Sequence, residues 1–133
     1  MKGLFADAYY FVALLNPRDE GHAAAVQATS SFSGEFWTTA WVLAEVANAC
    51  ARPPARSAFL SLLVDIENDP RVHIVSPSDE QFRRGKELYA RRSDKEWSLT
   101  DCISFLVMQE HALTEALTAD HHFEQAGFAI LLK

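Results

Sequence analysis

Residues 3–15 read Gly-Leu-Phe-Ala-Asp-Ala-Tyr-Tyr-Phe-Val-Ala-Leu-Leu, a short apolar run that ends in a carboxylate and passes directly into a helical pattern. The run is typical of a buried β-strand over Gly3–Asp7, and the apolar residues from Tyr9 to Leu15 predict a helix. Asn16-Pro17 ends that helix, because a residue before proline disfavours helical backbone. The chain therefore begins with a strand followed by a helix, the unit from which parallel sheets are built.

The same alternation continues along the rest of the chain. Further strands are predicted over Glu35–Trp37, Val72–Val75, Glu115–Thr118 and Phe128–Leu132. Further helices are predicted from Arg18 or Asp19 to Ser31, from Thr38 or Thr39 to Ala51, from Pro53-Pro54 to Asp69, from Ser78 through Tyr89, from Ser98 to His111, and from Asp120 to Gln125. Strands that are separated by helices rather than by tight turns pair in parallel. The fold class is therefore α/β, with helices on both faces of a parallel sheet.

Length and composition indicate one folded domain over residues 1–133. Hydrophobic residues make up 49% of the chain and charged residues 23%, which is typical of a globular protein rather than a disordered one. The longest uncharged stretch is too short to cross a bilayer, and the opening residues lack the pattern of an export signal. Cys50 and Cys102 lie in apolar helical patterns, so we expect buried free thiols and a reducing, cytoplasmic compartment.

The charge distribution is uneven. The formal net charge of −6 argues against a protein that simply coats nucleic acid. Six of the 12 basic residues nevertheless fall in one short window: Arg83, Arg84, Lys86, Arg91, Arg92 and Lys95. The sequence thus predicts a local positive stripe on an acidic body.

Three carboxylates stand alone in uncharged, mostly apolar stretches. Asp7 lies in the first strand–helix unit, Glu45 in the third predicted helix, and Asp101 at the start of the apolar helix that begins at Ser98. An ionised carboxylate in apolar surroundings costs several kcal/mol unless a cation or several hydrogen-bond donors meet it. Three such residues in one small domain suggest that they meet the same cation.

The predicted topology brings these acids to one place. Asp7 follows the first strand, Asp120 follows the strand at Glu115–Thr118, and Asp101 lies in the first turn of its helix. In open α/β sheets, ligands bind outside the carboxyl ends of the strands, where the strand order reverses. Glu45 reaches this crevice if its helix packs across the mouth. Carboxylate oxygens suit Mg²⁺ or Mn²⁺, which activate water and neutralise charge during attack on phosphorus, as in a nuclease.

Each acid also has a purely structural interpretation. Asp101 and Ser98 match a capping box, and Asp120 suits the first position of a short helix. Glu45 can be placed on an exposed edge of its helix. Asp7 is the hardest to explain structurally, because acids are depleted in strands and this one has large apolar neighbours.

Together these residues resemble the PIN domains, and among them the VapC-type toxins of toxin–antitoxin pairs. The resemblance spans nearly the whole chain in order. It rests on four blocks: Leu4-Phe5-Ala6-Asp7-Ala8; Ala44-Glu45-Val46-Ala47-Asn48; Trp97-Ser98-Leu99-Thr100-Asp101-Cys102-Ile103-Ser104-Phe105; and Thr118-Ala119-Asp120-His121-His122-Phe123 with Ala126-Gly127-Phe128. The third block and the Thr-x-Asp-x-x-Phe motif are its most specific parts.

The resemblance implies a metal-dependent endoribonuclease on a three-layer α/β/α fold with a small parallel sheet. It implies that Asp7 and Asp101 are the principal ligands of Mg²⁺ or Mn²⁺, and that Glu45 and Asp120 complete an acidic quartet. Ser98 and Thr100 would orient these carboxylates. The implied partners are an RNA substrate such as a tRNA or mRNA, an antitoxin of the VapB type, and a second copy of the chain.

The basic window divides into two parts. We expect Arg91, Arg92 and Lys95, which are close in sequence to Asp101, to hold RNA phosphates. Arg83 and Arg84 suit a solvated helix face, and Arg83 has the spacing of a helical ion pair with Glu87. The two histidines that follow Asp120 are expected to be surface residues outside the site.

Two other functions stay open from the sequence. One is a non-catalytic acidic α/β binding module, whose carboxylates bind the arginines of a partner. The other is a PIN-domain nuclease outside any toxin–antitoxin pair. The apolar helices around Tyr9–Phe11 and Phe59–Leu63 carry enough apolar surface for either a thick core or a partner site.

Overall fold

The computed structural model describes residues 3–133, which contain five strands and seven helices. The strands are β1 (Gly3–Ala6), β2 (Glu35–Thr39), β3 (Val72–Val75), β4 (Glu115–Leu117) and β5 (Ala129–Ile130). The helices are α1 (Ala8–Leu15), α2 (His22–Ser31), α3 (Ala40–Ala49), α4 (Ala55–Glu67), α5 (Asp79–Arg91), α6 (Leu99–Glu110) and α7 (His121–Gln125). The predicted alternation of strands and helices is confirmed.

The five strands form one parallel sheet in the order β3-β2-β1-β4-β5. The central strand β1 aligns Phe5 with Trp37 on one side and with Ala116 on the other. The chain runs outward from β1 to β2 and β3 and then returns to place β4 on the opposite side of β1. The strand order therefore reverses between β1 and β4, and a crevice opens there at the carboxyl ends of the strands.

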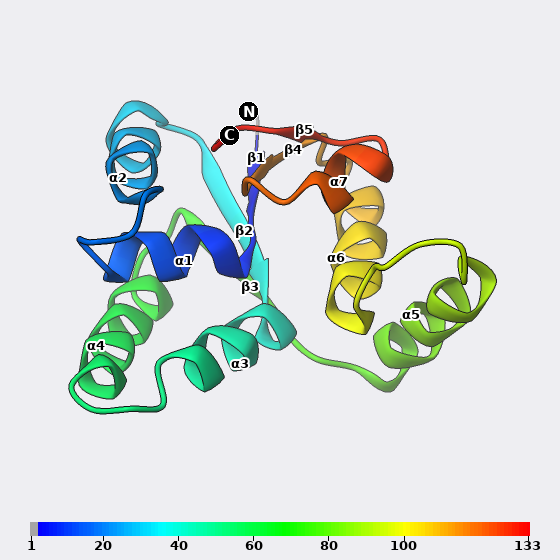
Figure 1. Cartoon of the computed structure of the whole chain (residues 1–133), viewed down its shortest axis with the longest axis horizontal. Helices are drawn as coiled ribbons and strands as arrows, with labels where there is room; N and C mark the ends of the chain where they lie inside the picture. Colours follow the sequence, from blue (N-terminus) through cyan, green and yellow to red (C-terminus); the bar gives the residue numbers. More distant parts are fainter. Residues whose placement is uncertain (1–2) are drawn as a thin grey trace.

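Helices cover both faces of the sheet and give a three-layer α/β/α arrangement (Figure 1). Figure 1 shows α1, α2 and α4 on one side of the strands and α5, α6 and α7 on the other, while α3 lies near the strands' carboxyl ends. The side chain of Ile103 on α6 leaves no room for a Cβ at Gly85 on α5, so these two helices pack closely. Among residues 3–133, no helix combines the length and apolar character that a membrane crossing requires.

The core lies between the sheet and both helical layers. Phe5 of β1, Phe105 of α6 and Phe123 of α7 are fully buried, and the rings of Phe105 and Phe123 meet edge to face with centroids 5.0 Å apart. Both cysteines are buried free thiols, as predicted. Between α1, α2, α4 and β2 the packing leaves a mainly apolar cavity of about 120 Å³.

The apolar helices singled out in the sequence divide between core and surface. Tyr10, Phe11 and Phe59 are buried, which supports the interpretation of a thick core. Leu60 and Val64, one turn apart on α4, are more than half exposed.

Several element boundaries differ from the prediction, most by one or two residues and one by three or more. The second helix begins at His22 rather than at Arg18 or Asp19, because the Asp19 carboxylate accepts a hydrogen bond from the Gly21 N–H and holds this segment in a turn. Strand β2 continues to Thr39, whose hydroxyl then caps α3 by accepting from the Val42 N–H. The next helix ends at Ala49 instead of Ala51.

Candidate active site

A cleft opens at the carboxyl end of the sheet, at the reversal between β1 and β4. It has a volume of about 510 Å³, and its walls come from β1, α1, α3, the start of α6 and the segment after β4. All four predicted acids line it, together with one further acid from the loop before α6: Asp7, Glu45, Asp101, Asp120 and Glu96. The structure therefore brings the predicted acidic quartet into one cleft.

Asp7 is the most buried of these acids, with 6% of its surface exposed. It lies between β1 and α1 as the N-cap residue of α1, but its side chain makes no capping hydrogen bond. The Thr118 hydroxyl donates to Asp7 Oδ2 over 3.0 Å. The pKa of Asp7 is raised from its ordinary 3.8 to about 7. Burial is the largest cause, the charges of Asp101 and Glu45 add to it, and hydrogen bonds with the Ala8 backbone and Thr118 oppose it.

Asp101 both caps a helix and faces the cleft. Asp101 Oδ2 accepts from the Ser98 N–H over 3.1 Å, and Ser98 Oγ accepts from the Asp101 N–H over 3.0 Å, which completes the predicted capping box. Burial raises the pKa of Asp101, and the charge of Asp120 raises it as well. The structural and functional interpretations of this residue are thus compatible, because the capping box fixes the carboxylate at the wall of the cleft.

Asp120 is likewise both a cap and a wall residue. It begins α7, and its Oδ1 accepts from the His122 N–H over 2.9 Å. Its own N–H donates to Thr118 Oγ1 over 3.1 Å. Since the same hydroxyl donates to Asp7, Thr118 couples the backbone that carries Asp120 to the carboxylate at the end of β1.

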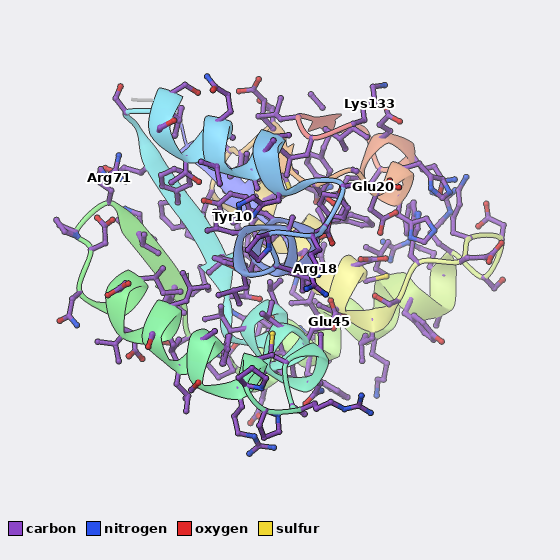
Figure 2. The ribbon with its side chains drawn as sticks, turned by 60° about the vertical axis from the view of Figure 1, so that its left-hand side comes forward. Tyr10, Arg18, Glu20, Glu45, Arg71 and Lys133 are labelled. Carbon is purple, nitrogen blue, oxygen red and sulfur yellow. The ribbon has the colours of Figure 1, made fainter. Side chains whose placement is uncertain are left out.

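Glu45 occupies an exposed part of α3 rather than the apolar surroundings expected from the sequence. The apolar residues around it in sequence point elsewhere, because Val42 and Val46 turn into the core. Figure 2 shows Glu45 on the side of α3 that lies toward α6. Partial burial raises the pKa of Glu45, followed by the charges of Asp101 and Asp120, while a hydrogen bond with Thr100 lowers it. Glu45 lines the cleft, so α3 lies close enough for this carboxylate to reach it.

Three residues at or beside the cleft had no predicted site role. Thr118, the end of a predicted strand and part of the Thr-x-Asp-x-x-Phe motif, is buried and donates to Asp7. Glu96 lines the cleft from the loop before α6. The placement of His122 outside the site is wrong, because its side chain is only 20% exposed and lines the cleft. Its Nδ1 lies 3.1 Å from Asp101 Oδ2 and 3.4 Å from Asp120 Oδ1. Its position two residues after Asp120 is the one sequence signal that pointed there.

The donor set of the cleft fits a divalent cation. No lysine or arginine is found among the described residues that line it, whereas five carboxylates are. Of the His, Cys, Asp and Glu side chains in residues 3–133, only those of Asp120, His121 and His122 form a group of three with donor atoms within 4.8 Å of one another. Carboxylate oxygens in a shared cleft are the ligands that Mg²⁺ and Mn²⁺ use.

The basic window runs along α5 and into the loop before α6. Arg83 pairs with Glu87 over 2.8 Å, as predicted, and also with Glu80. The Arg92 guanidinium is held by Asp94 over 2.9 Å and covers the Trp97 ring. Arg91 is exposed at the end of α5.

Lys95 lines a second groove of about 540 Å³, which adjoins the acidic cleft. The two hollows share Glu96 and Ser98 in their walls. Tyr89, with 54% of its surface exposed, contributes an aromatic ring to the same groove. The Lys95 ammonium group and the exposed Tyr89 ring thus lie in a groove next to the acids.

Comparison with known families agrees with this architecture. Residues 4–129 match the PIN domain. The chain belongs to the PIN-domain family. This PIN domain is 28% identical to the 23S rRNA-specific endonuclease VapC20 of Mycobacterium tuberculosis over 135 residues, which cover 94% of this chain and 95% of the relative. The sequence resemblance to VapC-type proteins is therefore confirmed.

Solved structures give the same result for the fold. The crystal structure of M. tuberculosis VapC20, described as a sarcin-ricin loop cleaving toxin, superposes on this PIN domain with a TM-score of 0.86 at 25% identity, covering 95% of this chain and 96% of that one. FitAcB from Neisseria gonorrhoeae (TM-score 0.66, 19% identity) and VapBC2 from Rickettsia felis bound to a promoter DNA fragment (0.67, 12%) each cover 96% of both chains. These last two share the fold.

Proposed function

We propose that this PIN domain is an endoribonuclease that hydrolyses RNA phosphodiester bonds with the help of Mg²⁺ or Mn²⁺. The observation that carries the proposal is the convergence of Asp7, Glu45, Asp101 and Asp120 on one cleft at the strand reversal of a parallel sheet. Burial, with the charges of neighbouring acids adding to it, raises the pKa values of Asp7, Glu45 and Asp101, and a bound cation would compensate these charges.

Asp7 and Asp101 are the proposed principal ligands of the cation, with Glu45 and Asp120 completing the set. A divalent ion in such a site activates water and neutralises the charge that develops on the phosphate. The residues around the acids hold the carboxylates in place: Thr118 fixes Asp7, Ser98 fixes Asp101, and Thr100 contacts Glu45. This preorganisation lowers the cost of ordering the site when the cation binds.

RNA binding requires positive charge beside this acidic cleft. We propose that Lys95 and Arg91 contact phosphates next to the cleaved bond, and that the exposed ring of Tyr89 stacks on a base in the adjoining groove. Arg92 was also predicted to bind RNA. Its pairing with Asp94 supports a smaller contribution, because a bound phosphate would have to compete with that carboxylate.

The proposed substrate and partners are based on what the relatives are described as cleaving and binding. The VapC20 enzyme is specific for 23S rRNA and is described as cleaving the sarcin-ricin loop, so we include a structured ribosomal RNA loop beside the tRNA or mRNA substrates considered from the sequence. We further propose that the protein is the toxin of a type II toxin–antitoxin pair, restrained by an antitoxin of the VapB type. Dimerisation, as implied by the resemblance, is part of the same proposal.

The experiment that tests the function compares the wild-type protein with Asp7→Asn. Purified wild-type protein should cleave RNA only when Mg²⁺ or Mn²⁺ is present, and Asp7→Asn should remove that cleavage while the protein stays folded. Asp65→Asn, which removes an equivalent charge from the exposed surface of α4, is the matched control.

Mapping of RNA ends in cells that express these variants would identify the substrate. If the wild-type protein cleaves no RNA with either metal, and Asp7→Asn leaves growth inhibition unchanged, the acidic binding module becomes the better explanation. Cleavage without growth inhibition would favour a PIN nuclease outside a toxin–antitoxin pair.

A further inference from the structure

His122 places an imidazole nitrogen among the carboxylates of the cleft. Its Nδ1 lies 3.1 Å from Asp101 Oδ2 and 3.4 Å from Asp120 Oδ1. The two acids belong to different elements: Asp101 lies in the first turn of α6, and Asp120 precedes α7. The side chain is mostly buried at this point, so its ring is held between the two acids rather than extended into solvent.

These distances are the ones found between ligands of a single ion. In an octahedral site with bonds of about 2.1 Å, neighbouring ligand atoms lie about 3 Å apart. An ion bound by Asp101 Oδ2 or by Asp120 Oδ1 would therefore lie within reach of His122 Nδ1. His121 is placed less favourably, because its side chain is 70% exposed and its Nδ1 lies 3.8 Å from Asp120 Oδ1.

Nitrogen ligands change which metal a site prefers. Mg²⁺ favours oxygen donors almost exclusively, whereas imidazole suits first-row transition metals, and affinity for such donors rises along that row. A cleft of carboxylates alone would bind Mg²⁺ and Mn²⁺ in a similar way. One imidazole in the ligand set shifts the balance toward Mn²⁺ and the later divalent ions.

We propose that His122 supplies a nitrogen ligand to a divalent ion held by Asp101 or Asp120, and that this ligand makes the cleft prefer Mn²⁺ over Mg²⁺. The inference rests on the metal site of the proposed function. It adds His122, a residue outside the acidic quartet, to the metal ligands and makes it the determinant of metal selectivity. Binding of the ion requires the unprotonated Nδ1 and replaces its hydrogen bond with Asp101, while the hydrogen bond from the His122 backbone N–H to Asp120 is retained.

The test measures metal binding without RNA. Calorimetric titrations of the full chain with MnCl₂ and with MgCl₂ would compare the wild type with His122→Gln. We expect His122→Gln to weaken Mn²⁺ binding about tenfold or more and to change Mg²⁺ binding far less. His111→Gln is the matched control, because His111 is exposed at the opposite end of α6 and stacks on Trp37.

Pulsed EPR of the Mn²⁺-loaded wild type gives a second readout that needs no variant. A ¹⁴N coupling typical of a bound imidazole should be present in the wild type and in His111→Gln, and absent in His122→Gln. An Mn²⁺ signal without this coupling, or an equal weakening of both metals by His122→Gln, would show that His122 only positions the carboxylates. Because no RNA is involved, this outcome is distinct from failure of the nuclease proposal, which shows as absence of cleavage by the wild type.

Discussion

Thr118 joins two acids of the cleft through one buried hydroxyl. It donates to Asp7 Oδ2 and accepts from the Asp120 N–H, and it is itself fully buried. A buried polar group that loses its partner costs about 1–3 kcal/mol, more when the group is charged. Thr118 therefore contributes both to stability and to the position of the carboxylates, although it has no chemistry of its own.

Thr118→Val tests this role, because valine keeps the shape and removes the hydroxyl. We expect the free energy of unfolding to fall by about 1–3 kcal/mol and the affinity for Mn²⁺ to fall as well. Thr29→Val is the control. It removes a hydroxyl that bonds to Tyr10 and Ala25 away from the cleft, so it should cost stability without changing metal affinity. Equal metal affinities in both variants would contradict the positioning role of Thr118.

The raised pKa of Asp7 predicts how stability depends on pH in metal-free protein. The folded pKa of about 7 lies above the ordinary value of 3.8, so the folded state binds this proton more tightly than the unfolded state. The free energy of unfolding should therefore fall as the pH rises from about 4 to about 7, and level off above that range. Asp7→Asn should show a smaller decline, because the raised pKa values of Glu45 and Asp101 still contribute, and it should be more stable by a few kcal/mol at most at pH 8.

Urea unfolding in EDTA at a series of pH values measures the effect. Addition of Mg²⁺ or Mn²⁺ provides the control, since a bound cation lowers the pKa of Asp7 and should reverse the difference between wild type and variant. Parallel pH profiles for the two proteins in EDTA would mean that Asp7 is not the group that titrates.

Some of the individual residues that line the cleft could be predicted from the sequence, and others could not. Asp7 and Asp101 were visible because a lone charge in an apolar stretch is unusual. His122 was not visible, because a histidine in a short helix has the same local sequence whether its ring faces solvent or a carboxylate from α6. Glu45 shows the opposite error, since its apolar neighbours in sequence point into the core while Glu45 does not.

Helix α6 places Asp101, a proposed metal ligand, in the wall of the cleft. Its first turn holds Asp101 through the capping box with Ser98, and its following residues, such as Ile103 and Phe105, are buried. The apolar part anchors the helix while its polar start lies at the wall of the cleft. The same capping interaction thus stabilises the helix and orients a proposed metal ligand.

Ser98→Ala should have an effect on RNA cleavage that the loss of an ordinary helix cap does not have. We expect it to lower the free energy of unfolding by about 1 kcal/mol and also to reduce RNA cleavage, because Asp101 loses one of its two capping contacts. Ser78→Ala on α5 removes an equivalent cap, in which Ser78 Oγ accepts from the Gln81 N–H. It should cost similar stability and leave cleavage unchanged. Denaturation curves and initial rates measure the two effects.

The elements themselves were largely predictable from periodicity, whereas their ends depended on hydrogen bonds. Ser78 and Ser98 were recognised as caps because the serine immediately precedes a helical pattern. The false start of the second helix arose because Asp19 also looks like a cap. In the structure its carboxylate accepts a hydrogen bond within a turn, and the helix begins only at His22.

Across the whole molecule, charge is divided between an acidic cleft and a basic border. The chain has a net charge of −6, so RNA binding must come from local cations rather than from the overall field. The candidates are Lys95, in the groove that adjoins the cleft, and Arg91, exposed at the end of α5, because Arg83, Arg84 and Arg92 are paired with acids. Binding should therefore depend on few phosphate contacts.

The salt dependence of RNA binding tests this division of charge. In an Asp7→Asn background, which binds without cleaving, Arg91→Ala and Lys95→Ala should each reduce the slope of log K against log salt by about 0.7 for single-stranded RNA. Arg56→Ala removes one exposed positive charge from α4, in the opposite helical layer, and should leave the slope unchanged. A slope that responds equally to all three would place RNA binding elsewhere.

The overall arrangement followed from topology more than from any single motif. Parallel pairing and the location of the crevice were predictable, because strands alternate with helices and two acids directly follow strands. The strand order was not read from the sequence. It depends on how α5 and α6 cross the sheet, and their close contact at Gly85 and Ile103 is a property of packing in three dimensions.

The apolar cavity between α1, α2, α4 and β2 has a practical consequence for crystallography. Its volume of about 120 Å³ is enough for a noble-gas atom, and it shares no lining residue with the acidic cleft. Crystals pressurised with xenon should therefore acquire a heavy atom beside Phe36 and Leu62, which would phase the diffraction data while the cleft stays available for soaking with manganese.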